Sequence, residues 1–386
     1  MGSSSSALRI RTIEFNDFRN YKHLKIADPG ELCVFVGHNA VGKTNILEGI
    51  QLLTSASSFR HPTINQLVRE GMPYGRISID ATDGNRQIDV MLSLETGKKR
   101  YTVNGKTKQA ADVRGLLPSV VFTPDDLQLA KKSSAVKRDA LDNLGMQLTR
   151  NYYMVRRDYE KTVRYKNRLL KDEAPRDLIE SINETLITCG SQLYRLRLAL
   201  FSRVIPQVTR VYDELAQAGE LFVSRYRASW DRVEDKLCWM EPPVDTMSLA
   251  QVREIMAKSL ELHGDEERRR GRSLIGPHND EIAFTLAGRD TALFASQGQQ
   301  RSVVLAWKLA EVNTIREVMG TTPVLLLDDV FSELDGNRRE MLVRFVTADV
   351  QTFITATDLD GFSDELVRRA RVVSLPIADD KDWNRE

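Results

Sequence analysis

A glycine-containing loop between an apolar run and an amphipathic segment constrains the fold of this chain more than any other feature. Residues 32–36 form a short apolar run that predicts a buried strand, and residues 45–50 predict a helix. The loop between them reads Gly-His-Asn-Ala-Val-Gly-Lys-Thr and matches the pattern GxxxxGK(S/T). A strand that leads through such a loop into a helix is a unit of parallel α/β domains. The sequence therefore predicts an α/β fold.

The residue types in this loop are those that hold nucleotide phosphates. Its glycines let several backbone N–H groups turn toward the phosphates, and the start of the following helix adds positive potential. We expect ATP to bind here, with Lys43 neutralising the β- and γ-phosphates and Thr44 ligating Mg²⁺. His38 is expected to be a tolerated filler of the loop. The predicted ATP-binding residues are Gly37, His38, Asn39, Ala40, Val41, Gly42, Lys43, Thr44 and Asn45.

A second motif supplies paired carboxylates near the other end of the chain. Residues 323–328 predict a buried strand that ends in Asp328, and Asp329 follows directly. With a phosphate loop upstream, this pair is typical of a Walker B motif, in which Asp328 would hold Mg²⁺. The alternative is a solvated strand end without a chemical role.

A third motif indicates the class of P-loop protein. Ser296, Gly298 and Gln299 precede a helical pattern at residues 303–310, and together they resemble the signature loop of ABC-type ATPases. The serine supplies a hydroxyl, the glycine permits close approach, and the helix start supplies positive potential. In this class the loop contacts the γ-phosphate held by the other subunit, so we expect an ATP-dependent homodimer. Residues 332–335 resemble the D-loop of the same class.

The class also suggests how the site would hydrolyse ATP. Asp329 stands where ABC-type ATPases usually carry a glutamate that polarises the attacking water. Its side chain is one methylene shorter, so we expect weak ATPase activity. Gln128 would be the Q-loop glutamine, or else an exposed polar residue of a loop. The expected catalytic residues are Asp329, Lys43 and Gln128.

The remaining patterns divide the chain into three parts. Alternating runs before residue 104 predict an antiparallel meander, whereas residues 134–272 show helical periodicity and many charges. The long pattern at 175–216 is expected to break at Pro206, which favours a compact lobe over a coiled coil. We predict an ATPase head with Walker A in its N-terminal half (1–133), an inserted helical lobe (134–272) and a C-terminal half (273–386) with the signature, Walker B and D-loop.

Taken together, the chain resembles the RecF family of ABC/SMC-like ATPases nearly from end to end. The matching blocks are residues 18–21, 37–45, 124–142, 276–280 and 326–342. Departures from the family pattern occur at Lys132, Ser134, Lys137, Ala140 and Asn279.

The resemblance implies a function that neither composition nor spacing shows. It implies a cytoplasmic protein of DNA replication and repair, the DNA-damage pathways and the SOS response. Such a protein binds double-stranded DNA as an ATP-dependent dimer near gap junctions. It works with RecR and RecO to help load RecA.

A local excess of basic residues gives DNA a place to bind on a nearly neutral chain. Residues 131–173 contain twelve basic and six acidic residues, a local charge of +6, whereas the whole chain carries +1. A basic helical stripe of this kind could follow duplex phosphates without reading the sequence. The alternative is a solvated helix face with tyrosines packed inward. The candidate DNA contacts are Arg156, Arg157, Lys161, Arg164 and Arg168.

Three other functions are alternatives to this one. The lack of a switch histidine, the helical insertion and the basic stripe disfavour an ABC-type subunit that drives a membrane partner, and no apolar run approaches the roughly 18 residues of a membrane span. A nuclease would need an added acidic metal-binding domain. An ATP-gated DNA-binding scaffold with incidental hydrolysis is the nearest alternative. The spacing of Cys33, Cys189 and Cys238 suits reduced packing residues rather than a zinc site.

Overall fold

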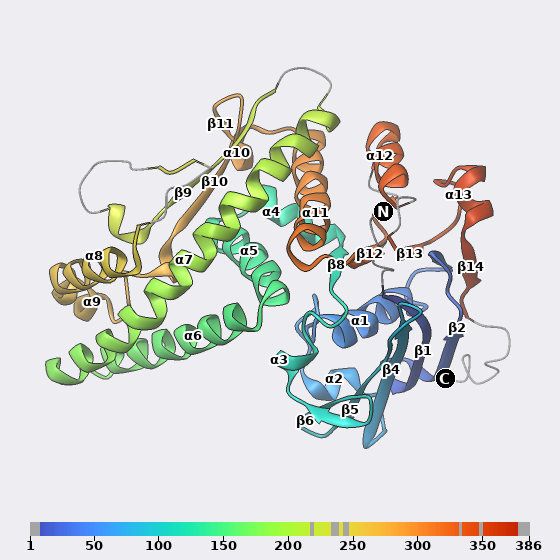
Figure 1. Ribbon diagram of the computed structural model, residues 1–386, viewed down its shortest axis with the longest axis horizontal. Helices are drawn as coiled ribbons and strands as arrows, with labels where there is room; N and C mark the ends of the chain where they lie inside the picture. The colour runs from blue at the N-terminus through green and yellow to red at the C-terminus, as the bar shows by residue number, and fades with distance from the viewer. Residues whose placement is uncertain are drawn as a thin grey trace. The chain divides into compact units, whose positions relative to one another are not determined.

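The computed structural model describes residues 8–216, 220–232, 239–241, 247–331, 334–346 and 350–376. Its contacts divide the chain into two units, one formed by Met1–Asp126 with Glu311–Glu386 and the other by Leu127–Ala310. Figure 1 labels most of the helices and strands of both units. The first unit combines the two ends of the chain, so it holds the phosphate loop and the paired aspartates together.

The first unit contains a six-stranded antiparallel sheet. Its strands, in spatial order, are β2 (Tyr21–Ala27), β1 (Arg9–Phe18), β4 (Tyr74–Thr82), β5 (Gln87–Glu95), β6 (Lys98–Val103) and β7 (Lys106–Lys108). Strands β4 to β7 form the predicted meander. Asn104 and Gly105 both have positive φ between β6 and β7, as a tight two-residue hairpin turn requires.

The second sheet of this unit has five parallel strands. Their order is β14 (Arg371–Ser374), β3 (Leu32–Val36), β13 (Thr352–Ala356), β12 (Val324–Asp328) and β8 (Ser119–Phe122). Helix α1 (Lys43–Thr54) packs against strands of both sheets. Because the strands are parallel, the carboxyl ends of β3, β12 and β13 meet at one edge, where a ligand site is expected.

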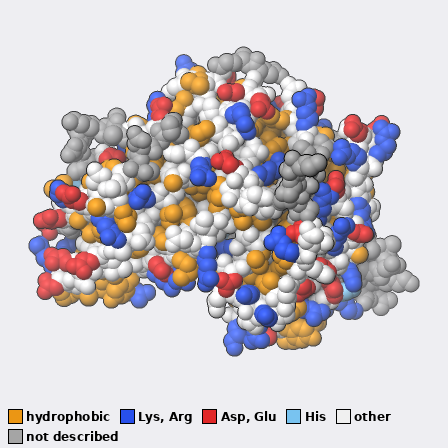
Figure 2. Space-filling view, in the orientation of Figure 1, with side chains coloured by type: hydrophobic (Ala, Val, Ile, Leu, Met, Phe, Trp, Pro, Cys, Tyr) orange, Lys and Arg blue, Asp and Glu red, His pale blue; other side chains and the backbone are white. Residues whose placement is uncertain are grey.

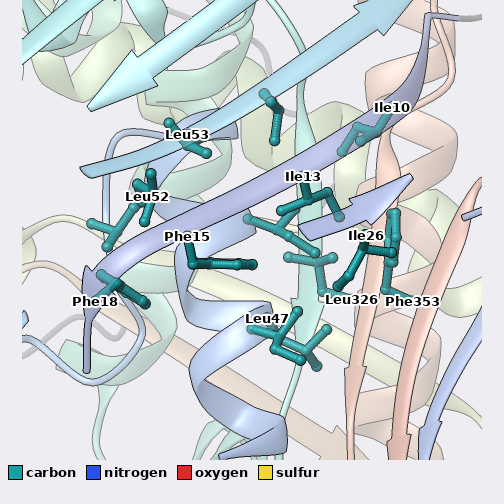
Figure 3. Packing of buried hydrophobic residues seen from close by; sticks show 14 of the residues in the cluster. Ile10, Ile13, Phe15, Phe18, Ile26, Leu47, Leu52, Leu53, Leu326 and Phe353 are labelled. Atoms are coloured by element: carbon teal, nitrogen blue, oxygen red, sulfur yellow. The ribbon is translucent and has the colours of Figure 1, made fainter. Parts of the chain in front are cut away.

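The core of the first unit lies between the two sheets. Figure 3 shows Phe15 of β1, Leu47 of α1 and Leu326 of β12 in one cluster of buried side chains. Burial of α1 within this cluster fixes the start of the helix relative to β12. The unit also contains α2 (Ile64–Leu67), α3 (Ala110–Val113), most of η1 (Pro124–Leu127), the end of α11 (Gln297–Met319), α12 (Gly336–Val346) and α13 (Asp364–Arg369).

The second unit is mostly helical. Its helices are α4 (Gln128–Lys131), α5 (Ser134–Leu148), α6 (Arg150–Lys171), α7 (Arg176–Leu215), α8 (Leu249–Leu262), α9 (Gly264–Arg270), α10 (Thr291–Phe294) and the start of α11 (Gln297–Met319), with the short turns η2 (Ser229–Arg232) and η3 (Pro277–Asn279). A small antiparallel sheet of β9 (Phe222–Arg227), β10 (Glu281–Leu286) and β11 (Arg289–Asp290) completes it.

Two features of this unit differ from the expectation. Helix α7 runs for 40 residues straight through Pro206, so the predicted break there is wrong. Pro206 lies on the exposed side of α7, and the opposite side is packed. Because proline has no N–H, one helix carbonyl loses its donor, and water can hydrogen-bond to that carbonyl on the exposed side. The contact division also extends beyond the predicted lobe of 134–272, because β10 pairs with β9 and draws the segment after residue 272 into the second unit.

The sequence predicted neither a membrane span nor a zinc site or disulfide. None of the described helices has the length and apolar character needed to span a membrane. Cys33 and Cys189 are buried and not in disulfides, whereas Cys238 lies outside the described residues. No group of three or more potential metal-binding His, Cys, Asp or Glu side chains occurs among the residues described.

Candidate functional site

The phosphate loop connects the end of β3 to the start of α1. Gly42 has φ +106° and a Cβ there would lie 2.5 Å from Asn20 Nδ2, so a side chain at this position would be strained twice over. A Cβ at Gly37 would lie 2.6 Å from the carbonyl oxygen of Leu375. Helix α1 begins at Lys43 with no side-chain cap and no acid in its first turn. Its N-terminal end is therefore suited to an anion.

The phosphate loop is held from outside by a residue that sequence reasoning did not single out. Asn20 Nδ2 donates to the carbonyl of Val41 over 3.2 Å, and Asn45 Nδ2 donates to Asn20 Oδ1 over 2.8 Å. The block at residues 18–21 was recognised only as part of the family resemblance. Its position after the first strand was the one available signal for this role.

Lys43 is the buried cation of the loop. Its side chain is 7% exposed, and Nζ donates to the carbonyls of Gly37 (2.6 Å) and His38 (3.0 Å). Burial lowers the pKa of Lys43, and the nearby carboxylates of Asp329 and Asp328 oppose this shift. The three groups thus place one positive and two negative charges at the edge of the parallel sheet.

Asp328 is the centre of the carboxylate end of the site. Thr44 Oγ1 and Thr355 Oγ1 each donate to Asp328 Oδ1 over 2.8 Å. This brings residues 44 and 328 together as the sequence predicted for a shared magnesium site. The Thr44 hydroxyl and the Asp328 carboxylate are hard oxygen donors of the kind that Mg²⁺ prefers. The donor set therefore fits the ion.

Asp329 follows in an unusual backbone conformation. Its φ is +53°, and its amide donates to Thr355 Oγ1 over 3.0 Å and to the Thr355 carbonyl over 3.3 Å. Aspartate tolerates this left-handed region better than most residues. Thr355 thus hydrogen-bonds to both Asp328 and Asp329, a role that the sequence analysis did not assign to it.

A buried glutamate organises the flank of the phosphate loop. Glu48 on α1 is fully buried and accepts two bonds of 2.8 Å from the guanidinium of Arg19 and one of 2.6 Å from the hydroxyl of Ser58. Arg60 lies 3.9 Å from the same carboxylate and donates to Asn45 Oδ1 over 2.7 Å. These residues were not predicted, because their charge pattern alone does not distinguish them from surface residues.

The signature residues lie in the second unit, at the start of α11. Ser296 Oγ accepts from the amide of Gln299 over 3.2 Å, and Gln299 Oε1 accepts from the amide of Ser296 over 2.6 Å. This reciprocal pair is a capping box with glutamine in the usual place of glutamate. Gln299 Nε2 also donates to both carboxylate oxygens of Glu220, at 2.8 and 2.9 Å. The loop around Gly298 therefore has a defined shape within its own unit.

Two other predicted positions can be located but not assigned a role. Gln128 is the first residue of α4 in the second unit, so its part in catalysis stays a prediction. In the D-loop candidate, Leu334 and Asp335 are described, whereas Ser332 and Glu333 lie outside the described residues.

The candidate DNA contacts on α6 separate into two kinds. Arg156 is 14% exposed and pairs with Asp139 (2.9 Å), Glu160 (2.8 Å) and Asp142 (3.4 Å). It is therefore an internal ion-pair residue, and the expectation that it faces DNA does not fit its surroundings. The other predicted contacts are half-buried or exposed, namely Arg157, Lys161, Arg164 and Arg168, and Lys171 extends the same face.

The family blocks in the second unit meet in a buried polar network. Arg197 of α7 donates two bonds of 2.9 Å to Asp142 and one of 2.6 Å to the carbonyl of Pro277. Asp280 accepts from the Tyr226 hydroxyl and from the Ser229 amide. Burial would raise the pKa of Asp142, but Arg197 outweighs it, so this pKa lies below its usual range. These bonds join α5, α7, β9 and the segment 277–280 within the lobe.

Comparisons with known proteins identify the family of this chain. The family model described as "RecF/RecN/SMC N terminal domain" matches residues 9–373 of this chain. A protein of Symbiobacterium thermophilum named "DNA replication and repair protein RecF" is 36% identical over 358 residues, covering 91% of this chain and 92% of that protein. A protein of the same name from Bacillus subtilis is 30% identical, covering 94% and 96% of the two chains.

Solved structures give the same result. The structure titled "recombination mediator protein RecF-ATP in RecFOR pathway" matches with a TM-score of 0.83 at 26% identity, over 94% of this chain and 95% of that one. The RecF-ATPrS structure of the same pathway matches with a TM-score of 0.86 at 26% identity, over 97% and 98%. An Smc head domain from Pyrococcus furiosus matches with a TM-score of 0.52 at 14% identity, over 95% and 93%, which supports the fold alone.

Proposed function

This chain belongs to the RecF family of ABC/SMC-type ATPases, and we propose that it binds double-stranded DNA in an ATP-dependent manner during DNA repair. The observation that carries the proposal is the meeting of Thr44 with Asp328 at 2.8 Å beside the buried Lys43. The fold brings these residues together from opposite ends of the chain. A chance match to either motif would not predict that contact.

The chemistry proposed for the site follows from its donors. Lys43 and the amides of the loop would bind the phosphates, while Thr44 and Asp328 would hold Mg²⁺, which would offset phosphate charge. Asp329 would accept a hydrogen bond from the attacking water. Its side chain is shorter than the glutamate usual in this class, so we propose slow hydrolysis that DNA stimulates. Gln128 would complete the site.

The signature loop supports an ATP-dependent homodimer. Ser296 and Gly298 lie at the N-terminal end of the 23-residue helix α11, which suits an anion supplied by another copy. In this arrangement each site would consist of the phosphate loop of one subunit and the signature loop of the other. ATP would then link the two subunits.

Helix α6 supplies the proposed DNA-binding face. The positions 157, 161, 164, 168 and 171 recur at helical spacing, so these side chains form one stripe along α6. Over 14 residue steps the stripe is roughly 21 Å long. In Figure 2, Lys and Arg side chains are interspersed with Asp and Glu over the visible face. A short local stripe suits contact with phosphates rather than with base edges.

The pathway assignment rests on the relatives alone. RecF structures titled as members of the RecFOR pathway cover nearly this whole chain. We propose that this protein likewise acts with RecR and RecO in loading RecA at gap junctions. The nearest alternative remains an ATP-gated DNA-binding scaffold in which hydrolysis is incidental.

The proposal is tested by fluorescence anisotropy with a labelled duplex, in the presence of ATP or ADP. We expect binding with ATP that is lost in both Lys43→Ala and Ser296→Arg, and that falls steeply as salt is raised. Binding that is indifferent to nucleotide and to both substitutions would refute the coupling of ATP to DNA. Turnover measured with and without DNA would separate the repair ATPase from the scaffold.

A further inference from the structure

The second unit contains a cavity between the N-terminal part of α7 and the helices α8 and α9. Its volume is about 530 Å³. Helix α8 lies beside α7, as Figure 1 shows. Pockets of roughly 300–1,000 Å³ commonly hold small molecules, so the cavity is large enough for a ligand of its own.

The lining of the cavity is acidic, and part of its charge is paired within the protein. Five acidic and two basic side chains line it. Asp265 of α9 pairs with Arg176 of α7 at 3.0 Å. Glu267 of α9 is buried and pairs at 2.6 Å with Lys166 of α6, which is outside the lining. These two acids are therefore compensated without a ligand.

The other three carboxylates of the lining have no such partner. Glu180 and Glu184 lie one helical turn apart on α7, and Glu261 lies on the neighbouring helix α8. Within the part of the chain that the structure describes, none of the three forms an ion pair or a hydrogen bond. The remaining base of the lining, Arg268, donates to the carbonyl of Ala174. Two walls of the cavity thus carry negative charge, and Arg268 offsets only one of the three carboxylates.

Apolar side chains and an unsatisfied amide line the same cavity. Ile179 and Ile187 of α7 and Leu260 of α8 supply the apolar surface. Asn183 of α7 also lines the cavity, and its Oδ1 is buried with no hydrogen-bond partner among the described residues. A buried carbonyl oxygen without a donor is unfavourable, so a turn of this side chain toward an N–H donor in the cavity would be stabilising.

We propose that this cavity binds a linear aliphatic polyamine. Its ammonium groups would lie against the unpaired carboxylates, and its methylene chain would lie against Ile179, Ile187 and Leu260. No three His, Cys, Asp or Glu side chains of the described residues are grouped as a metal ion requires, so the arrangement favours a longer cation that reaches separate carboxylates. The inference uses neither the nucleotide site nor the proposed DNA-binding face, and it is therefore independent of the proposed function.

The test is isothermal titration calorimetry of the full chain with spermidine. ATP and DNA are left out, because both are polyanions that bind polyamines themselves. The wild type should show saturable binding at a single site. In Glu180→Gln/Glu184→Gln, binding should weaken by on the order of 10-fold, because two of the three unpaired carboxylates lose their charge while the side chains keep their shape. The matched control is Glu241→Gln/Glu254→Gln, which makes the same change of charge at exposed positions of the second unit outside the lining, and it should bind like the wild type.

A second variant tests the cavity rather than its charge. Ala257 of α8 is exposed in the lining, so Ala257→Trp should fill the cavity without entering the core, and binding should be lost. Spermidine should raise the thermal midpoint of the wild type, since it binds the folded state, but it should not raise that of Ala257→Trp.

Several outcomes would overturn the inference. They are the absence of binding by the wild type, equal affinity in the two double variants, full binding by Ala257→Trp, and displacement of spermidine by MgCl₂ at matched ionic strength. A lysine-rich peptide that binds more tightly than spermidine, and that loses affinity in Glu180→Gln/Glu184→Gln, would also overturn it, because the cavity would then be a site for a basic segment of another protein.

Discussion

Replacing Glu48 with glutamine should destabilise the first unit strongly, although the two side chains have nearly the same shape. Glu48 is fully buried on α1, and its carboxylate accepts both bonds of 2.8 Å from Arg19, which is 18% exposed. A glutamine would keep one acceptor oxygen but turn an NH₂ group toward the guanidinium. One charge-assisted bond would be lost, and the cation would remain partly buried without its counter-charge.

The size of the effect follows from the burial of the pair. Breaking a fully buried ion pair costs about 3–5 kcal/mol, because the remaining charge is uncompensated. Arg19 can recover some hydration, so we expect the free energy of unfolding to fall by about 2–4 kcal/mol. The same substitution at Glu31, whose partner Arg9 is 31% exposed, should cost less than about 1 kcal/mol.

Urea unfolding would measure both variants, with the m-value compared to test whether the transition is of the same kind. A double-mutant cycle with Arg19→Met should then give a coupling energy of about 2 kcal/mol. ATP affinity should fall as well, because Glu48 also positions the segment that reaches Asn45 through Arg60. A loss of stability no greater than that of Glu31→Gln would refute the reasoning.

Three further predictions concern other parts of the molecule. Burial lowers the pKa of His278 to about 4, so the unfolded chain takes up a proton that the folded chain does not. Stability should therefore fall by about 2–3 kcal/mol as the pH drops from about 6.5 to about 4, and thermal midpoints of His278→Gln should lack this component. Arg156→Ala should lower the thermal midpoint with little change in the salt dependence of DNA binding, whereas Arg164→Ala should reduce the slope of log K against log salt by about 1 with little change in stability. Asn20→Ala should weaken ATP binding by about 5- to 10-fold in calorimetry while the fold persists, since two hydrogen bonds that hold the phosphate loop are lost.

The sequence predicted those parts of the fold that depend on local chemistry. The apolar run at 32–36 is strand β3, and Asp328 ends strand β12, where the Walker B interpretation put it. Each of these follows from a short pattern that has few alternative structures. Thr44 and Asp328, which the sequence analysis assigned to Mg²⁺, are in contact because the parallel strands bring their carboxyl ends to one edge.

Prediction was poorest where packing outweighs local preference. A proline was expected to end a helix, yet α7 continues through Pro206 because the rest of its length is anchored by packing and its proline faces outward. Helical periodicity also could not show which of the basic residues on α6 are paired. Arg156 and Lys161 are alike in the sequence pattern. The structure distinguishes Arg156, because its side chain pairs with Asp139 and Glu160.

The same reasoning explains how family blocks that are far apart in the sequence meet in the second unit. Asp142 closes one block and Pro277 belongs to another, and Arg197 binds both from α7. Removing one member of this network would leave a buried charge unpaired, so its members constrain one another's chemistry. Resemblance at these positions therefore reports on how the lobe is held together. Arg164, a candidate DNA contact, is exposed and lies outside the network.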